Sequence, residues 1–286
     1  MAESSRPRVL IGITTRNRAS ILPKALASAL AQSYSPLEIA VVDDASDDDT
    51  PLLAAGHPTV RWIRHERMEG YRTGRNELMR QPGPDFYVSL DDDAWFLQAD
   101  AIALAVARMQ NNPQLGAIAF DVLSPDRPEP GPRGTPRPAA IFIGCGHMLR
   151  LRAVAAAGFY ADTPGPYGAE EKDLALRLSD LGYTVEFLPG VHVWHDKAWQ
   201  DRDWFPLHRS GVCNELVMTA RRCPLPDLLL VLPLKLASFS WYWLRRPGFL
   251  RPGLAGLWDA ACAMPQTLAT RQPVRRSTFW QFSFPR

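Results

Sequence analysis

Three consecutive carboxylates follow an apolar run that has the character of a buried strand. Residues 86–90 read FYVSL, and Asp91, Asp92 and Asp93 come directly after them. Carboxylates this close together repel one another unless a cation lies among them, and Mg²⁺ prefers such oxygen ligands. The run therefore suggests a divalent metal site, although an acid that binds ribose hydroxyls or a solvated capping loop would also fit it.

A second acidic cluster follows another strand-like segment. Asp43 and Asp44 come directly after EIAVV at 38–42, and three more aspartates occupy 47–49. The later group could cap a helix that begins near Thr50, whereas Asp43 and Asp44 are placed to bind a nucleotide's base or ribose. Two parallel strands would deliver both clusters to one edge of a sheet, which favours a ligand site there.

The elements that must position these acids alternate along the chain. Strand-like apolar runs lie at 9–14, 38–42, 60–64, 86–90, 115–120, 140–145 and 184–188. Helix-like segments separate the early runs, among them 73–80, and a later helix is expected at 171–182, where a glycine ends it. This alternation predicts βαβ units on a largely parallel sheet, whose carboxyl ends form the crevice where ligands bind.

Composition and charge distinguish the front of the chain from its tail. The 286 residues are 46% hydrophobic, which is enough for one or two lobes around a substantial core. Residues 124–138 hold six prolines and predict a linker or mobile loop. From Phe205 onward eleven Lys and Arg accompany three Asp and Glu, against 21 and 27 before it. The basic tail is therefore expected to meet an anionic surface.

The tail contains a strongly apolar and aromatic segment, 224–248, which Asp227, Pro233 and Lys235 interrupt. The interruptions argue against a transmembrane helix, which needs about 20 apolar residues. Five arginines flank the segment, at 221, 222, 245, 246 and 251. We therefore expect residues 221–251 to lie on a membrane surface, with a helix packed on its own core as the alternative. The basic residues form no stripe with aromatics, so nucleic acid is not an expected partner.

The chain's start and its cysteines bear on its location. No apolar run of signal-peptide length precedes the first strand-like segment, which predicts a cytoplasmic protein, peripheral at the inner face of the membrane. The four cysteines have neither a CxxC pair nor ligand-like spacing, which fits reduced thiols, and no role is assigned to them. They are Cys145, Cys213, Cys223 and Cys262.

Six motifs in one order resemble the family 2 glycosyltransferases of the GT-A fold. They are VLIGITTRNR, EIAVVDDASDDDT, GYRTGRN, SLDDDAW, GAEEKDLALRLSDLGY and VHVWH, and together they cover about 9–195. The resemblance implies an α/β fold with a Rossmann-like mixed central sheet flanked by helices, followed by a helical membrane-associating tail. It implies a catalytic domain, 1–204, with a nucleotide-sugar-binding half (1–123), the proline-rich loop (124–138) and an acceptor half (139–204). A basic, apolar helical region, 205–286, follows.

The resemblance also implies an activity. A family member moves a sugar, with inversion, from a nucleotide-diphosphate sugar to a hydroxyl of a glycan or lipid-linked acceptor, as in cell-surface polysaccharide synthesis. A sugar-nucleotidyltransferase is one alternative, but it should carry a glycine-rich loop where this chain reads TTRNRASILPK. A non-catalytic module that binds carbohydrate or membrane is the other.

Carried over position by position, the motifs assign a donor site. Asp93 matches the direct ligand of a divalent metal, Mg²⁺ or Mn²⁺, and Asp91 and His195 complete the metal site. Asp44, with Asp43 as the less favoured choice, matches the acid that recognises the base. The other positions that match the nucleotide-sugar site are Thr14, Arg16, Arg75, Asp91 and Asp92.

The acceptor side is less strongly patterned. Glu171 matches the second acid of the family's ED pair, the general base, although a glutamate replaces the usual aspartate in AEEKD. Asp173 and Arg177 are four residues apart and are expected to pair on the helix surface. Trp199 and Trp204 could form the wall of an acceptor-sugar subsite or pack in a core.

Overall fold

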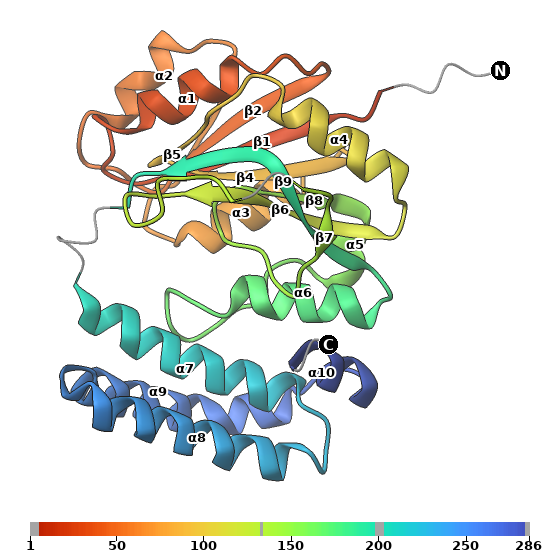
Figure 1. Ribbon diagram of the computed structural model, residues 1–286. Coiled ribbons are helices and arrows are strands. Elements are labelled where there is room, and N and C mark those ends of the chain that lie inside the picture. Colours follow the sequence, from red (N-terminus) through yellow and green to blue (C-terminus); the bar gives the residue numbers. More distant parts are fainter. Residues whose placement is uncertain (1–5, 132–133, 198–202, 284–286) are drawn as a thin grey trace. The chain divides into compact units, whose positions relative to one another are not determined.

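The computed structural model describes residues 6–131, 134–197 and 203–283, which form two compact units (Figure 1). Unit 1 comprises Met1–Phe159 and Gly182–Lys197, and unit 2 comprises Tyr160–Leu181 and Ala198–Arg286. The chain thus leaves unit 1, contributes one helical segment to unit 2, returns for a last strand and leaves again. The expected division of 1–204 into a donor half, a loop and an acceptor half stays a prediction.

Unit 1 is built on a mixed sheet in the order β3-β2-β1-β4-β8-β6-β9-β5, with β7 beside β9. Neighbours are parallel from β3 to β4 and between β6 and β9, and antiparallel at the other pairings. The strands are β1 (Val9–Thr15), β2 (Leu37–Asp43), β3 (Arg61–Arg64), β4 (Phe86–Asp91), β5 (Ala94–Phe96), β6 (Leu115–Leu123), β7 (Arg137–Pro138), β8 (His147–Arg150) and β9 (Thr184–His195). The expected mixed sheet is confirmed.

Helices cover the sheet of unit 1 and make up the described part of unit 2. Those of unit 1 are α1 (Leu22–Leu30), α2 (Leu53–Gly56) with the 3₁₀ turn Thr50–Leu52, α3 (Tyr71–Met79), α4 (Ala101–Asn111) and α5 (Leu151–Ala157). Those of unit 2 are α6 (Glu170–Asp180), α7 (Trp204–Arg222), α8 (Leu228–Arg245), α9 (Leu250–Ala269) after the 3₁₀ turn Pro247–Phe249, and α10 (Arg276–Ser283).

The core of unit 1 follows from strand alternation. Val9, Ile11 and Ile13 point to one face of β1, where they join Leu22 and Leu26 of α1 in a single buried cluster. Helix α4 contributes its own apolar stripe to the same cluster. The parallel strands are therefore buried by helices and hold their carboxyl ends at a defined edge.

Two strand predictions differ from the structure. The apolar run at 140–145 forms no strand, and Ile141 and Ile143 within it are about half exposed. Backbone pairing begins at Gly146, whose φ of +71° makes the turn into β8. The short strand β5 was not predicted, and β9 joins the run at 184–188 and the VHVWH motif into one strand.

Unit 2 packs α7, α8 and α9 alongside one another (Figure 1). Gly256 of α9 permits close approach to α7, since a Cβ there would lie 2.4 Å from the carbonyl oxygen of Arg209. The pair between Asp173 and Arg177 forms as expected, but it is buried rather than on the helix surface, because Arg222 of α7 also binds Asp173. Among the helices of residues 6–131, 134–197 and 203–283, none is both long and apolar enough to span a membrane.

Candidate metal and nucleotide site

The acidic clusters lie at one edge of the sheet of unit 1, as the strand pattern predicted. Thr15 at the end of β1 is in register with Asp43 of β2, and Thr14 is in register with Asp91 of β4. Two strand spacings, about 10 Å, therefore separate the acids on either side of β1. The edge between them is wide enough for an extended ligand.

Three residues that were expected to hold a metal meet at this edge. His195 ends β9 and pairs with Ala94 of β5, which places its ring beside the turn that follows β4. Its Nε2 lies 3.0 Å from Asp93 Oδ1 and 3.9 Å from Asp91 Oδ2. Asp93 and His195 are buried and Asp91 is partly exposed. Two carboxylates and one imidazole nitrogen fit a divalent cation that keeps positions open for phosphate oxygens.

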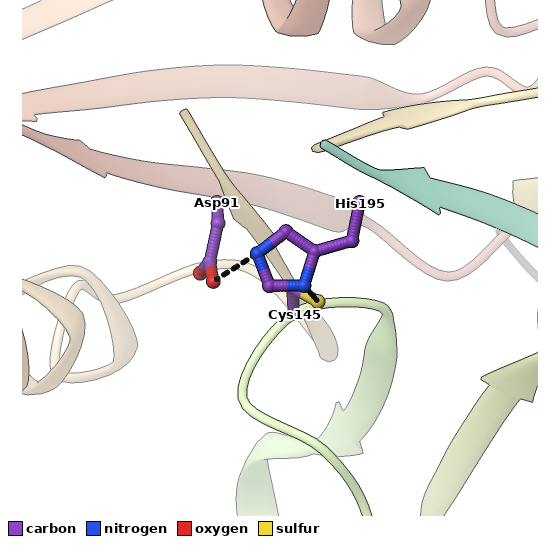
Figure 2. A group of neighbouring side chains, drawn as sticks. All are labelled: Asp91, Cys145 and His195. Carbon is purple, nitrogen blue, oxygen red and sulfur yellow. Dashed lines mark hydrogen bonds and ion pairs between the residues drawn. The ribbon is translucent and has the colours of Figure 1, made fainter. Parts of the chain in front are cut away.

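Cys145 is a fourth member of the cluster, and the sequence assigned it no role. Its Sγ lies 3.1 Å from His195 Nδ1, the ring nitrogen opposite the acids (Figure 2). Burial raises the pKa of this thiol well above its ordinary value, so it is held neutral. Asp91, Cys145 and His195 each offer a ligand atom within 4.8 Å of the others. Because the acids approach Nε2, a cation between them and His195 would have the thiol in its outer shell.

Arg75 reaches the same acids from α3. Its Nη2 donates to Asp91 Oδ1 at 2.6 Å, and its guanidinium lies 4.8 Å from the ring centre of Tyr71. The helix can approach the sheet closely because Gly74 has no side chain: a Cβ there would lie 3.0 Å from methyl carbons of Thr14 and Val42. The GYRTGRN motif thus places a buried cation beside the acidic turn.

Asp44 is buried and already bound by its own chain. It accepts hydrogen bonds from the backbone amides of Glu69 and Gly70, each at 2.8 Å, and from His65 Nδ1. Burial alone would raise the pKa of Asp44, but these bonds outweigh it and lower the pKa. Of about four acceptor positions on a carboxylate, three are used in holding the loop before α3. The assignment of Asp44 to base recognition stays a prediction.

Asp43 is the other candidate for the base, and it is also buried. Its Oδ1 accepts from the backbone amide of Ser46, while Oδ2 lies 3.5 Å from Arg64 Nη1 without a hydrogen bond. An acid at a strand end with one oxygen that accepts no hydrogen bond can accept one from a ligand. The structure brings Asp43 and Asp44 to the predicted edge but does not distinguish their roles.

The remaining donor-site candidates differ in exposure. Burial raises the pKa of Asp92 to about 7, and its carboxylate lies 4.0 Å from Arg18 Nε. Thr14 is partly buried beside the acidic turn through its register with Asp91. Arg16 is exposed and its Nη1 contacts the sulfur of Met68 at 2.8 Å.

The candidate base belongs to unit 2. Glu171 lies in the first turn of α6 and is partly exposed, whereas Asp173, two residues later, is buried in ion pairs with arginines. The structure therefore separates an accessible acid from a structural one on the same helix. Trp204 begins α7 and is 45% exposed, and Trp199 lies outside the described residues.

The fold of the chain is the GT-A fold of nucleotide-sugar-dependent glycosyltransferases. A mannosyltransferase, PcManGT from Pyrobaculum calidifontis, in complex with GDP-Man and Mn²⁺, is 22% identical with a TM-score of 0.60, over 93% of this chain and 80% of that one. TarS 1–349 from S. aureus in complex with UDP-GlcNAc is 13% identical with a TM-score of 0.65, over 92% and 84%. Residues 10–148, just under half of the chain, match the model of glycosyl transferase family 2.

Two proteins are related to parts of this chain in sequence. Chondroitin synthase from Escherichia coli is 30% identical over 116 residues, which are 39% of this chain and 17% of that protein. Succinoglycan biosynthesis protein ExoO from Rhizobium meliloti (strain 1021) is 40% identical over 89 residues, which are 30% of this chain and 26% of that protein. The matches thus span about a quarter or less of these relatives.

Proposed function

We propose that the chain is an inverting, metal-dependent glycosyltransferase that moves a sugar from a nucleotide-diphosphate sugar to a hydroxyl of a glycan or lipid-linked acceptor. The observation that carries the proposal is the convergence of Asp91, Asp93, His195 and Arg75 at the carboxyl edge of the sheet. The match of residues 10–148 to glycosyl transferase family 2 supports it, as do relatives named for chondroitin and succinoglycan synthesis. The acceptor would then belong to a cell-surface polysaccharide.

On the donor side, Asp93, Asp91 and His195 would hold Mg²⁺ or Mn²⁺. When bound, the cation would neutralise the diphosphate that leaves with the nucleoside. Arg75 offers a rigid donor fork to the same phosphates from its buried position. Asp44 or Asp43 would bind the base, and the other nucleotide-sugar contacts would come from Thr14, Arg16 and Asp92.

On the acceptor side, Glu171 would take the proton of the attacking hydroxyl. The acceptor oxygen then bonds to the anomeric carbon as the bond to the diphosphate oxygen breaks, which inverts the anomeric configuration. Asp173 takes no part in this scheme, because its oxygens bind arginines.

The proposed place of action is the inner face of a membrane. A cytoplasmic chain that rests on the bilayer would meet an acceptor that is lipid-linked, and the basic tail suits that position.

The donor is identified by thermal unfolding with a panel of nucleotide-diphosphate sugars, each with Mn²⁺, Mg²⁺ or a chelator. One sugar nucleotide is expected to raise the melting temperature only when the metal is present, since a ligand that binds the folded state alone stabilises it. Asp93→Asn should abolish the shift. Asp100→Asn is the matched control, because Asp100 is exposed and makes no capping hydrogen bond.

The chemistry is tested with the donor found in that screen. Glu171→Gln should keep the metal-dependent stabilisation and lose sugar transfer, and product NMR should show an inverted anomeric centre. Normal turnover in Glu171→Gln or in Asp93→Asn would contradict the assignment. Formation of a nucleoside triphosphate and a sugar 1-phosphate when pyrophosphate is added would favour a nucleotidyltransferase, and stabilisation with neither transfer nor hydrolysis would favour a binding module.

A further inference from the structure

Helices α8 and α9 leave their apolar sides uncovered. On α8, five large residues are between 57% and 77% exposed: Leu229, Leu230, Leu234, Trp241 and Leu244. On α9, four more are between 43% and 72% exposed: Leu250, Leu254, Trp258 and Leu268. These nine residues recur at helical spacing and define what we call the apolar helix face. Because α8 and α9 pack against each other, the two stripes lie on neighbouring helices (Figure 1).

The charges that interrupt the apolar sequence belong to the other side of these helices. Lys235 pairs with Glu215 of α7, and Asp259 pairs with Arg209 of α7. Asp227, just before α8, is buried and paired with Arg276. The charged residues that interrupt the run in sequence are therefore engaged by other residues of unit 2.

Cations gather where the two helices meet. Arg245, Arg246 and Arg251 are exposed around the turn between α8 and α9, and the first two stack on Trp241 and Tyr242. No acidic residue occurs between 228 and 258. The apolar helix face thus has a cationic end without anions of its own to balance it.

Arg221 and Arg222, which were also expected to lie on the membrane surface, are not at the turn between α8 and α9. Arg222 is buried in its ion pair with Asp173, and Arg221 donates to the backbone oxygen of Asp162. The surface is therefore shifted toward the C-terminus relative to 221–251 and includes α9.

We propose that the apolar helix face lies in the interface of an anionic phospholipid bilayer. The leucines and tryptophans enter the acyl boundary, the helix axes lie in the membrane plane, and the three arginines bind lipid phosphates. An anionic bilayer supplies both an apolar medium for the leucines and tryptophans and negative charge for the three arginines. A second copy of the chain would supply an apolar surface, but it would bring its own three arginines close to these three. This inference deepens the proposed function. It rests on that function only in the link to a lipid-linked acceptor, and the binding of the bilayer itself does not depend on it.

Flotation of the purified full chain tests the proposal. Vesicles of phosphatidylcholine mixed with phosphatidylglycerol should carry the chain upward, less so at high salt, and phosphatidylcholine alone should carry little. Leu254→Ser with Trp258→Ser should lower partitioning by more than about tenfold. Each of Arg245→Gln, Arg246→Gln and Arg251→Gln should lower it on the order of fivefold.

Matched controls come from exposed residues of unit 1. Leu52→Ser, Arg67→Gln and Arg152→Gln remove side chains of the same kinds and should leave flotation unchanged. Circular dichroism confirms that each variant is folded. Failure of the folded wild-type chain to float, or equal flotation of all variants, would overturn the proposal.

Sedimentation of the same proteins without lipid decides the competing occupant. If the wild-type chain is a stable dimer and the double variant Leu254→Ser with Trp258→Ser is a monomer, the face belongs to a second copy and the membrane proposal is overturned. A monomeric wild-type chain supports the membrane proposal. Stabilisation by a sugar nucleotide needs no vesicles, so a failure of flotation and a failure of the proposed transfer reaction are separate results.

Discussion

Replacing Asp173 with asparagine should destabilise unit 2, whereas replacing Glu171 on the same turn should not. Asp173 Oδ2 accepts from Arg177 Nε at 2.8 Å, and Oδ1 accepts from Arg222 Nε at 2.6 Å. All three residues are buried. Removing one member of such a group leaves charges without compensation and costs about 3–5 kcal/mol. Asparagine keeps one acceptor oxygen, so we expect the lower end of that range.

A loss of about 3 kcal/mol corresponds to a decrease in melting temperature of roughly 10–20 °C for a unit of this size. Thermal and urea unfolding, followed by circular dichroism, measure the loss. Glu171→Gln is the control, with an expected change within about 0.5 kcal/mol. Arg222→Gln in a double-mutant cycle should show a coupling on the order of 1–3 kcal/mol. Unfolding of Asp173→Asn at the wild-type temperature would refute the argument.

Three further changes test unit 1. Cys145→Val removes the partner of His195 Nδ1 and should weaken Mn²⁺ binding by about tenfold in calorimetry, while Cys145→Ser retains it; equal affinities would exclude a positioning role. Gly74→Val presses α3 away from the sheet and should cost about 1–3 kcal/mol in urea unfolding, and a neutral result would show that the helix shifts freely. Burial alone would lower the pKa of His65, but its bonds to Glu77 and Asp44 outweigh burial and raise the pKa. Protonated His65 therefore stabilises the folded chain. This contribution is complete below the unfolded pKa of about 6.5 and is lost as pH rises through the folded pKa. The difference in melting temperature between wild type and Glu77→Gln should therefore be largest near about pH 6 and shrink at higher pH, and a gap independent of pH would be inconsistent with this linkage.

The strands that carry the donor site could be predicted because their signal is local. The apolar runs that became β1, β2 and β4 are each followed by polar or acidic residues, so the sheet edge was visible in the sequence. Strand β5 was not, because its three residues gain their conformation from pairing with β9 about a hundred positions later. The error at 140–145 has the same origin: apolar residues there lack a partner strand.

The grouping of the candidate site residues in space was predictable where motifs carried it and not elsewhere. Asp91, Asp93 and His195 were assigned together through motif order, and the structure places them within hydrogen-bonding or ion-pair distance. A single cysteine with no spacing pattern gives no signal, so Cys145 could be found only from its position beside His195. Helical spacing predicted that Asp173 and Arg177 pair, but not that a third residue from another helix buries them.

Glu215 connects the proposed base to the apolar helix face within unit 2. Its Oε1 accepts from Lys172 at 2.6 Å, next to Glu171 on α6, and it also pairs with Lys235 of α8. Burial alone would raise the pKa of Glu215, but the two lysines lower it, so it stays ionised. This one partly buried anion on α7 thus pairs both with the turn that carries the proposed base and with α8, whose leucines face outward. A helix rotated to expose Lys235 would hide part of the apolar helix face, so the ion pair between Lys235 and Glu215 favours the orientation of α8 in which that face is proposed to meet the bilayer.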